Sequence, residues 1–135
     1  MGFIVTDALE VEVLTTLLNT PLSLRLFSNN FTPVGTMAIG SFTEVTGGGY
    51  AAKPILFAGW NIVSGVSRAT YSPLQEFTFT GPPSGPGTTY GYYLTRDSDS
   101  RVYLAERWSP ALIPFNPVAG SKVRVSLAFD ATSQF

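Results

Sequence analysis

The sequence predicts an all-β fold, a jelly-roll-like β-sandwich with a short N-terminal helix, in a single domain of 135 residues. Most segments after Pro21 alternate apolar and polar residues with a period of two, which is the strand pattern. Turns rich in Gly and Pro separate these segments at spacings that suit a sandwich. Only one segment, near the start, has helical periodicity. We therefore divide the domain into a helical arm, residues 1–20, and a β-sandwich, residues 21–135.

The helix is expected from Asp7 to Leu18. Asp7 and Glu10 have the spacing of a capping box, and Pro21 disfavours helical geometry at the residue before it. Its apolar side chains form two adjacent rows: Leu9, Val13 and Leu17, then Val11, Leu14 and Leu18. Together they make an apolar stripe wide enough to dock on a neighbour.

The first half of the β region is uneven. The segment LSLRLF, residues 22–27, places three leucines on one face and Ser23 and Arg25 on the other. A run of apolar residues, 55–63, predicts a strand that is buried on both faces and bent at Gly59. The remaining segments are a weak strand at 39–45, a flexible connection at 46–54 and a loop or short edge strand at 64–72.

The second half is more regular. The segment QEFTFT, residues 75–80, directs Phe77 and Phe79 inward. In the next predicted strand, Tyr90, Tyr92 and Leu94 lie on one face and Tyr93 lies on the other. In the strand after it, Val102, Leu104 and Glu106 lie on one face, and Tyr103 and Ala105 lie on the other. After a long surface connection, residues 109–121, the clearest amphipathic strand spans 122–129, with Val123, Val125, Leu127 and Phe129 inward.

The segment GPPSGPG, residues 81–87, lies between two predicted strands. Glycine-rich loops cradle phosphates when a helix follows, but here a strand follows, and prolines remove amide donors. We interpret the segment as a hairpin tip stiffened by proline, or as a tip that contacts a protein neighbour.

Composition argues against several classes of chemistry. The chain has no Cys and no His, which excludes disulfides, thiol nucleophiles and Ser-His-Asp triads, and removes the commonest zinc ligands. Eight basic and nine acidic residues give no basic excess for nucleic acid. No apolar run approaches the roughly 20 residues that a membrane helix needs. We expect no enzymatic activity, no cofactor and no metal.

Acidic residues supply the remaining catalytic candidates. A pair of carboxylates could hydrolyse glycosides, and of Glu44, Glu76, Glu106 and Asp130 only Glu106 shares a predicted face with apolar residues. We favour a structural, ion-paired carboxylate there. Residues 97–100 lack the glycine and glutamate of a calcium loop, so they indicate a polar turn.

Aromatic residues are plentiful while charged residues are few, which favours burial against a partner. A sugar-stacking platform is the alternative use of these aromatic side chains: Trp60, Trp108, Tyr50, Tyr90, Tyr92 and Tyr93. The candidate capsid or subunit interface consists of Leu9, Val13, Leu17, Tyr50, Tyr93 and Trp108. The helix and the loop 47–53 are the candidate docking elements.

Several segments together resemble the small structural proteins of tailed bacteriophages that are described as capsid decoration or cement proteins. The resembling segments are LSLRLFSNNFTPVGT (22–36), FTEVTGGGYAAKPI (42–55), TTYGYYLTRDSDSRVYLAERW (88–108) and GSKVRVSLAFDATSQF (120–135). The resemblance covers most of the chain and includes no catalytic motif. It implies a β-rich fold and a place on the virion, often as a trimer.

The sequence thus predicts a non-enzymatic virion structural protein that decorates and stabilises the capsid. Its expected partners are the major capsid protein and further copies of itself, with a homotrimer favoured. It would be made in the cytoplasm of the bacterial host and reside on the capsid surface. The alternatives are a tail-associated or receptor-binding module, a carbohydrate-binding module that uses Trp108 and the tyrosines, and a small glycosidase that uses Glu106.

Overall fold

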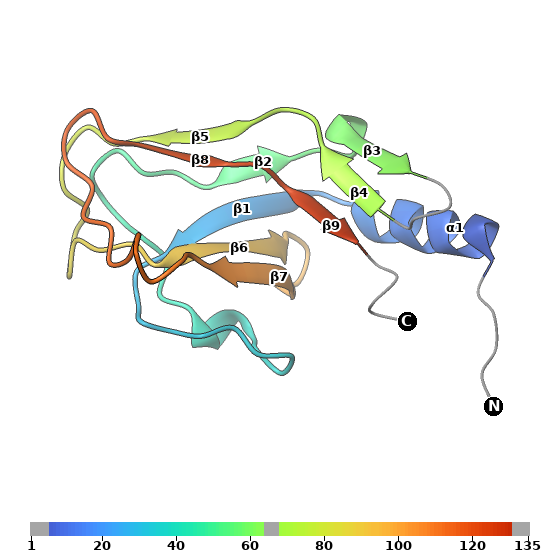
Figure 1. Ribbon diagram of the computed structural model, residues 1–135, viewed down its shortest axis with the longest axis horizontal. Coiled ribbons are helices and arrows are strands. Elements are labelled where there is room, and N and C mark those ends of the chain that lie inside the picture. The colour runs from blue at the N-terminus through green and yellow to red at the C-terminus, as the bar shows by residue number, and fades with distance from the viewer. Residues whose placement is uncertain (1–5, 64–67, 131–135) are drawn as a thin grey trace.

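A computed structural model describes residues 6–63 and 68–130. This part of the chain is mostly sheet with one short α-helix (Figure 1), which confirms the all-β prediction. The elements in chain order are α1 (Asp7–Leu18), β1 (Leu22–Phe27), the 3-10 helix η1 (Ile39–Ser41), β2 (Lys53–Ile55), the 3-10 helix η2 (Phe57–Gly59), β3 (Trp60–Val63), β4 (Arg68–Tyr71), β5 (Gln75–Thr78), β6 (Gly91–Arg96), β7 (Val102–Arg107), β8 (Lys122–Val125) and β9 (Ala128–Asp130). None of the helices within these residues is long and apolar enough to cross a membrane.

The strands form three antiparallel sheets. The largest has the order β2-β1-β6-β7, and the others are β3-β4-β9 and β5-β8. Because β4 runs on to β5 and β8 runs on to β9, the two small sheets form one interrupted ribbon. Figure 1 shows β5 and β8 above β1, β6 and β7, and β9 descending beside them at the right. These strand orders do not establish a jelly roll, and that topology stays a prediction.

Helix α1 has the predicted bounds but a different cap. The Thr6 hydroxyl, not Asp7, accepts a hydrogen bond from the Leu9 amide at 3.2 Å, so Thr6 is the N-cap residue. The predicted row of Leu14 and Leu18 turns inward, with both side chains buried. The helix lies beside β3 at one end of the molecule.

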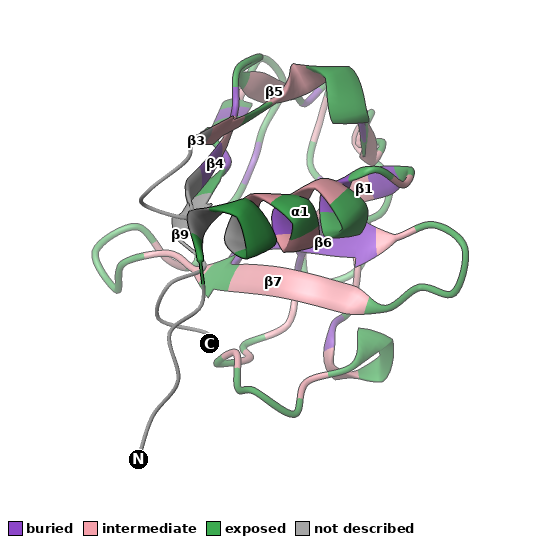
Figure 2. Ribbon diagram, turned by 90° about the vertical axis from the view of Figure 1, so that its right-hand side faces the viewer, coloured by how far each residue is buried: buried purple, intermediate pink, exposed green. Residues whose placement is uncertain are grey.

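The main core lies between the large sheet and the ribbon. It contains the three leucines of β1, Phe77 and Phe79, all buried as predicted. The other face of the large sheet is not left to solvent, because the segment 28–45 covers it with a second, aromatic cluster: Phe27, Phe42 and Tyr93, with Phe31, Met37 and Tyr90 packed around them. Figure 2 shows this burial as purple on β1 and β6.

The structure contradicts three strand predictions for the first half of the β region. Residues 39–45 form η1 and a single bridge between Phe27 and Glu44 instead of a strand. Residues 55–63 are not one strand, because η2 separates β2 from β3. Gly59 does lie at the break, and a β-carbon there would overlap the Tyr71 ring. Of the segment 64–72, residues 64–67 lie outside the described part, and β4 is the central strand of its sheet, not an edge.

The β6–β7 hairpin contains an irregularity that sequence alternation does not show. Leu94 pairs with Leu104, but Thr95 pairs with Val102, so Tyr103 is an extra residue in β7. Val102 therefore packs against the aromatic cluster while Leu104 packs against the main core, contrary to the shared face predicted for them. Tyr90, which precedes β6, also packs against the aromatic cluster and not beside Tyr92.

The segment 81–87 is not a hairpin tip. The strands on either side of it belong to different sheets, so it crosses from the ribbon to the large sheet. It packs on the glycine loop 47–49, whose three residues all have positive φ, and the Ser84 amide donates to the Thr46 carbonyl at 2.7 Å. Only glycine adopts this backbone readily at three successive positions.

The predicted C-terminal strand 122–129 is divided into β8 and β9. Val123, Val125 and Leu127 are buried and Lys122, Arg124 and Ser126 are exposed, as predicted. The predicted inward direction of the Phe129 side chain lies outside the described part.

Candidate functional site

The helix keeps one of its two predicted apolar rows on the surface. Leu9 is 48% exposed and Leu17 is 42% exposed, and Val13 between them is half-buried. The neighbouring row of Leu14 and Leu18 already packs inward. The outer row is therefore an apolar surface that the described part of the chain leaves open, and we call it the helix row.

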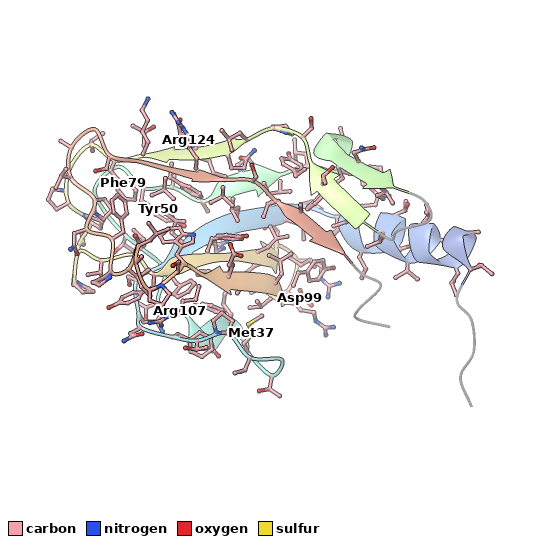
Figure 3. The ribbon with its side chains drawn as sticks, in the orientation of Figure 1. Met37, Tyr50, Phe79, Asp99, Arg107 and Arg124 are labelled. Atoms are coloured by element: carbon pink, nitrogen blue, oxygen red, sulfur yellow. The ribbon has the colours of Figure 1, made fainter. Side chains whose placement is uncertain are left out.

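Tyr50 serves an internal network. Its hydroxyl donates to Glu44 Oε2 at 2.7 Å and accepts from the Leu26 amide at 3.1 Å. Arg25 donates to both oxygens of the same carboxylate, at 2.9 and 3.0 Å. Figure 3 shows Tyr50 between β1 and the ribbon, where its ring stacks on Phe77. These contacts fix the loop 47–53 to the sheet, so Tyr50 has a structural role.

Tyr93 lies in the interior. It is 1% exposed, and its ring stacks on Phe42 with the centroids 4.3 Å apart. A buried side chain offers no surface to a partner, so the prediction that Tyr93 belongs to an interface is wrong for this fold. Its alternation with Tyr92 is as predicted, since Tyr92 packs on the opposite side of the sheet.

Trp108 lines a groove on the surface. This groove has a volume of about 450 Å³ and is open to solvent. Four parts of the chain form its walls: β6, the end of β7, the connection that follows β7, and β8. The lining residues are Tyr92, Glu106, Trp108, Leu112, Phe115, Lys122, Val123, Arg124, Val125 and Ser126. It is concave and largely apolar, with a few charged groups at its rim, as binding sites often are. We call it the β8 groove.

The charges of the β8 groove are mostly satisfied. Arg124 Nε lies 2.7 Å from Glu76 Oε2, and Lys122 Nζ lies 3.7 Å from Glu76 Oε1. The hydrogen bond from Arg124, together with the charge of Lys122, lowers the pKa of Glu76. Figure 3 shows Arg124 on the outer side of the ribbon.

Glu106 does not have the structural ion pair that we expected. No ion pair within residues 6–63 and 68–130 includes it, and Arg107 instead donates to Asn30 Oδ1 at 2.5 Å. Its carboxylate lies beside Tyr92, whose pKa is raised by burial and then by this negative charge. Glu106 is thus an exposed acceptor on the wall of the groove.

The other predicted acidic features are structural. Glu44 and Glu76 are paired with cations, and the side chain of Asp130 lies outside the described part. Residues 97–100 form the predicted polar turn, in which Arg96 holds the pKa of Asp99 down at about 2. Among the described residues no group of three acidic side chains is placed to hold a metal ion.

Sequence reasoning found Trp108 but missed most of its neighbours in the groove. Leu112 and Phe115 lie in a Pro-rich connection that has no periodicity, although two large apolar residues in a surface segment were a signal. The residues of β8 were assigned correctly to inner and outer faces, but a strand pattern does not show which of its edges is paired.

Three tyrosines, of which Tyr93 is buried and Tyr50 and Tyr92 are half-buried, should make the fold sensitive to alkali. Burial is the main cause of the raised pKa of Tyr50, Tyr92 and Tyr93, and Glu44 or Glu106 adds to it. In the unfolded chain these phenols ionise near pH 10, while in the fold they keep their protons. The contribution of these tyrosines to the unfolding free energy should therefore be fully present below about pH 9 and be lost as the pH rises above about 10. Urea unfolding at about pH 8 and about pH 11 measures this, and equal midpoints at the two values would contradict it.

Comparisons with known proteins identify no relative. No protein-family model, no curated protein and no solved structure matches this chain. The resemblance to decoration proteins therefore stays a prediction from the sequence.

Proposed function

We propose that this protein is a non-enzymatic structural protein of a bacteriophage virion, which decorates and stabilises the capsid by bridging capsid subunits. In this proposal the chain folds as a jelly-roll-like sandwich, assembles as a homotrimer and binds the major capsid protein on the outer surface of the shell. The resemblance in the sequence and the low content of charged residues support it.

The helix row is the observation that carries the proposal. Leu14 and Leu18 already pack the helix on its own domain, and the part of the chain that the structure describes leaves Leu9 and Leu17 on the outside. Burying such side chains against another protein contributes about 25 cal/mol per Å² of apolar area. The row lies at one end of the molecule, on an element that projects beyond the sheets (Figure 1), so it can reach a neighbouring subunit.

Repetition over a symmetric shell would strengthen such a contact. Each copy contributes a modest apolar interface, but copies linked in an oligomer bind with a high effective concentration. A protein that bridges two shell subunits then stabilises the shell, because separation of the subunits would have to expose the apolar area of the bridge.

The helix row makes a direct test possible. The double variant Leu9→Ser, Leu17→Ser should lose at least about tenfold in affinity for shells that lack this protein, because about 1.4 kcal/mol of contact energy corresponds to that factor. Co-sedimentation with purified shells measures the affinity. Val34→Ser is the matched control, since Val34 is 51% exposed but lies in the segment after β1. A wild-type protein that is monomeric and does not sediment with shells would overturn the proposal.

A further inference from the structure

The β8 groove follows the edge of β8 that faces away from β5. Five consecutive residues, Lys122–Ser126, line it. Successive side chains of a strand point to opposite faces, so a groove that touches all five must run along the edge of the strand. Within the described residues β8 pairs only with β5, so this edge has no neighbouring strand.

Hydrogen-bond alternation identifies the groups that face the groove. The Phe79 amide donates to the carbonyl of Ser121, the residue opposite it, at 2.8 Å. In an antiparallel ladder such bonded pairs recur at every second residue, so Val123 and Val125 exchange their backbone bonds with β5. The amides and carbonyls of Lys122 and Arg124 therefore point away from β5. Among the described residues, neither has a backbone–backbone bond to a loop or another sheet.

The opposite wall supplies apolar contacts. Trp108 and Phe115 are half-buried there, and Leu112 is 63% exposed. An extended chain beside β8 would direct every second side chain toward this wall. The groove therefore combines backbone donors and acceptors on one side with aromatic rings on the other, which is the arrangement used for strand addition.

We propose that the β8 groove binds an extended segment of a partner polypeptide as an additional strand beside β8. The segment spans about 17 Å, the length of five strand residues, and has apolar side chains at alternate positions. It carries no more than one basic residue, because Lys122 and Arg124 are paired with Glu76, and of the described residues that line the groove only Glu106 is an acid. A saccharide fits less well, because the unsatisfied groups on β8 are backbone groups. This inference goes beyond the proposed function and requires no virion.

A designed peptide tests the site directly. The probe is Thr-Phe-Thr-Val-Thr, acetylated and amidated at its ends, and the control has the same side chains with N-methylated backbone amides. At a probe concentration about ten times the Kd, exchange of the Lys122 and Arg124 amide hydrogens should slow about tenfold. Their resonances in ¹H–¹⁵N spectra should shift, and the methylated control should cause neither change.

Two variants separate the backbone from the side chain. Arg124→Pro removes the amide that faces the groove and leaves the ladder to β5 intact, so it should weaken probe binding at least about tenfold. Arg124→Ala removes the ion pair with Glu76 but keeps the amide, so its affinity should stay within about threefold of wild type. If Arg124→Pro does not fold, the exchange measurement on the wild-type protein still decides the question.

Other occupants would give different results. Neutral hexoses and disaccharides that shift the Trp108 indole resonance, when the peptide does not, would overturn the proposal in favour of a sugar site. A wild-type oligomer that dissociates in Arg124→Pro but not in Arg124→Ala would assign the edge to a second copy of this chain and would also overturn it. If the exchange rates and resonances of the Lys122 and Arg124 amides do not change at the highest probe concentration, the proposal is overturned. Because no shell is used, failure here leaves the proposed function unaffected.

Discussion

Replacing Gly91 with alanine is expected to remove a large part of the stability of the fold. A β-carbon on Gly91 would overlap the carbonyl oxygen of Glu106 in the neighbouring strand β7 and would lie 2.8 Å from the Phe27 ring. The oxygen belongs to the backbone of a paired strand, so it cannot move aside as a flexible side chain can. Overpacking costs about 1–3 kcal/mol and sometimes more, and we expect about 3 kcal/mol or more. That is a large part of the 5–15 kcal/mol typical of domains.

The control for this substitution is Gly40→Ala. A β-carbon on Gly40 would meet no atom within 4 Å, and its φ is not in the left-handed region. Its effect should lie within about 0.5 kcal/mol. Urea unfolding of the two variants beside wild type gives the difference in midpoint and slope. A Gly91→Ala protein within about 1 kcal/mol of wild type would show that β6 and β7 separate more easily than their pairing indicates.

Replacing Tyr93 with alanine should destabilise the domain by about 3–5 kcal/mol. Tyr93 is almost fully buried, and its removal leaves a cavity beside Phe27 and Phe42, both of which contact its ring. Large aromatic side chains in cores cost about this much when they are truncated. Thermal or urea unfolding measures the loss directly.

Tyr93→Phe separates a core role from an interface role. The phenylalanine ring keeps the stacking on Phe42 and fills nearly the same volume, so the cost should be below about 1.5 kcal/mol. An interface residue would give the reverse pattern, with weaker association and unchanged stability of the isolated domain. If Tyr93→Ala were as stable as wild type, the aromatic cluster would not be a second core.

Short-range patterns anticipated much of the secondary structure. The helix bounds agree because the rows of apolar residues and Pro21 are local signals. The leucines of β1, Phe77, Phe79, Val123 and Val125 are buried as predicted, because alternation records which face of a strand meets the core. Alternation did not predict the face of Val102, because one extra residue in β7 places Val102 and Leu104 on opposite faces of the sheet.

The candidate site was less predictable. Leu9 and Leu17 were correctly placed on an apolar row, but which row would stay outside depended on how α1 packs beside β3. Tyr50 and Tyr93 were predicted to lie at an interface because the chain is rich in aromatic and poor in charged residues, but both serve internal contacts. Composition and alternation do not distinguish a tyrosine that packs under a loop from one that faces solvent.

By itself, the sequence determined that this is a β-rich chain with one short helix and which side chains of most strands face inward, because those features depend on neighbouring residues. Only the tertiary structure decided that residues 81–87 cross between sheets and that the segment 28–45 covers a second core. It also decided that, among the described residues, the edge of β8 beside Trp108 has no neighbouring strand. The physical reason is that strand pairing joins residues far apart in the chain, and many partners satisfy the same alternating pattern. The choice among them depends on the packing of the whole domain.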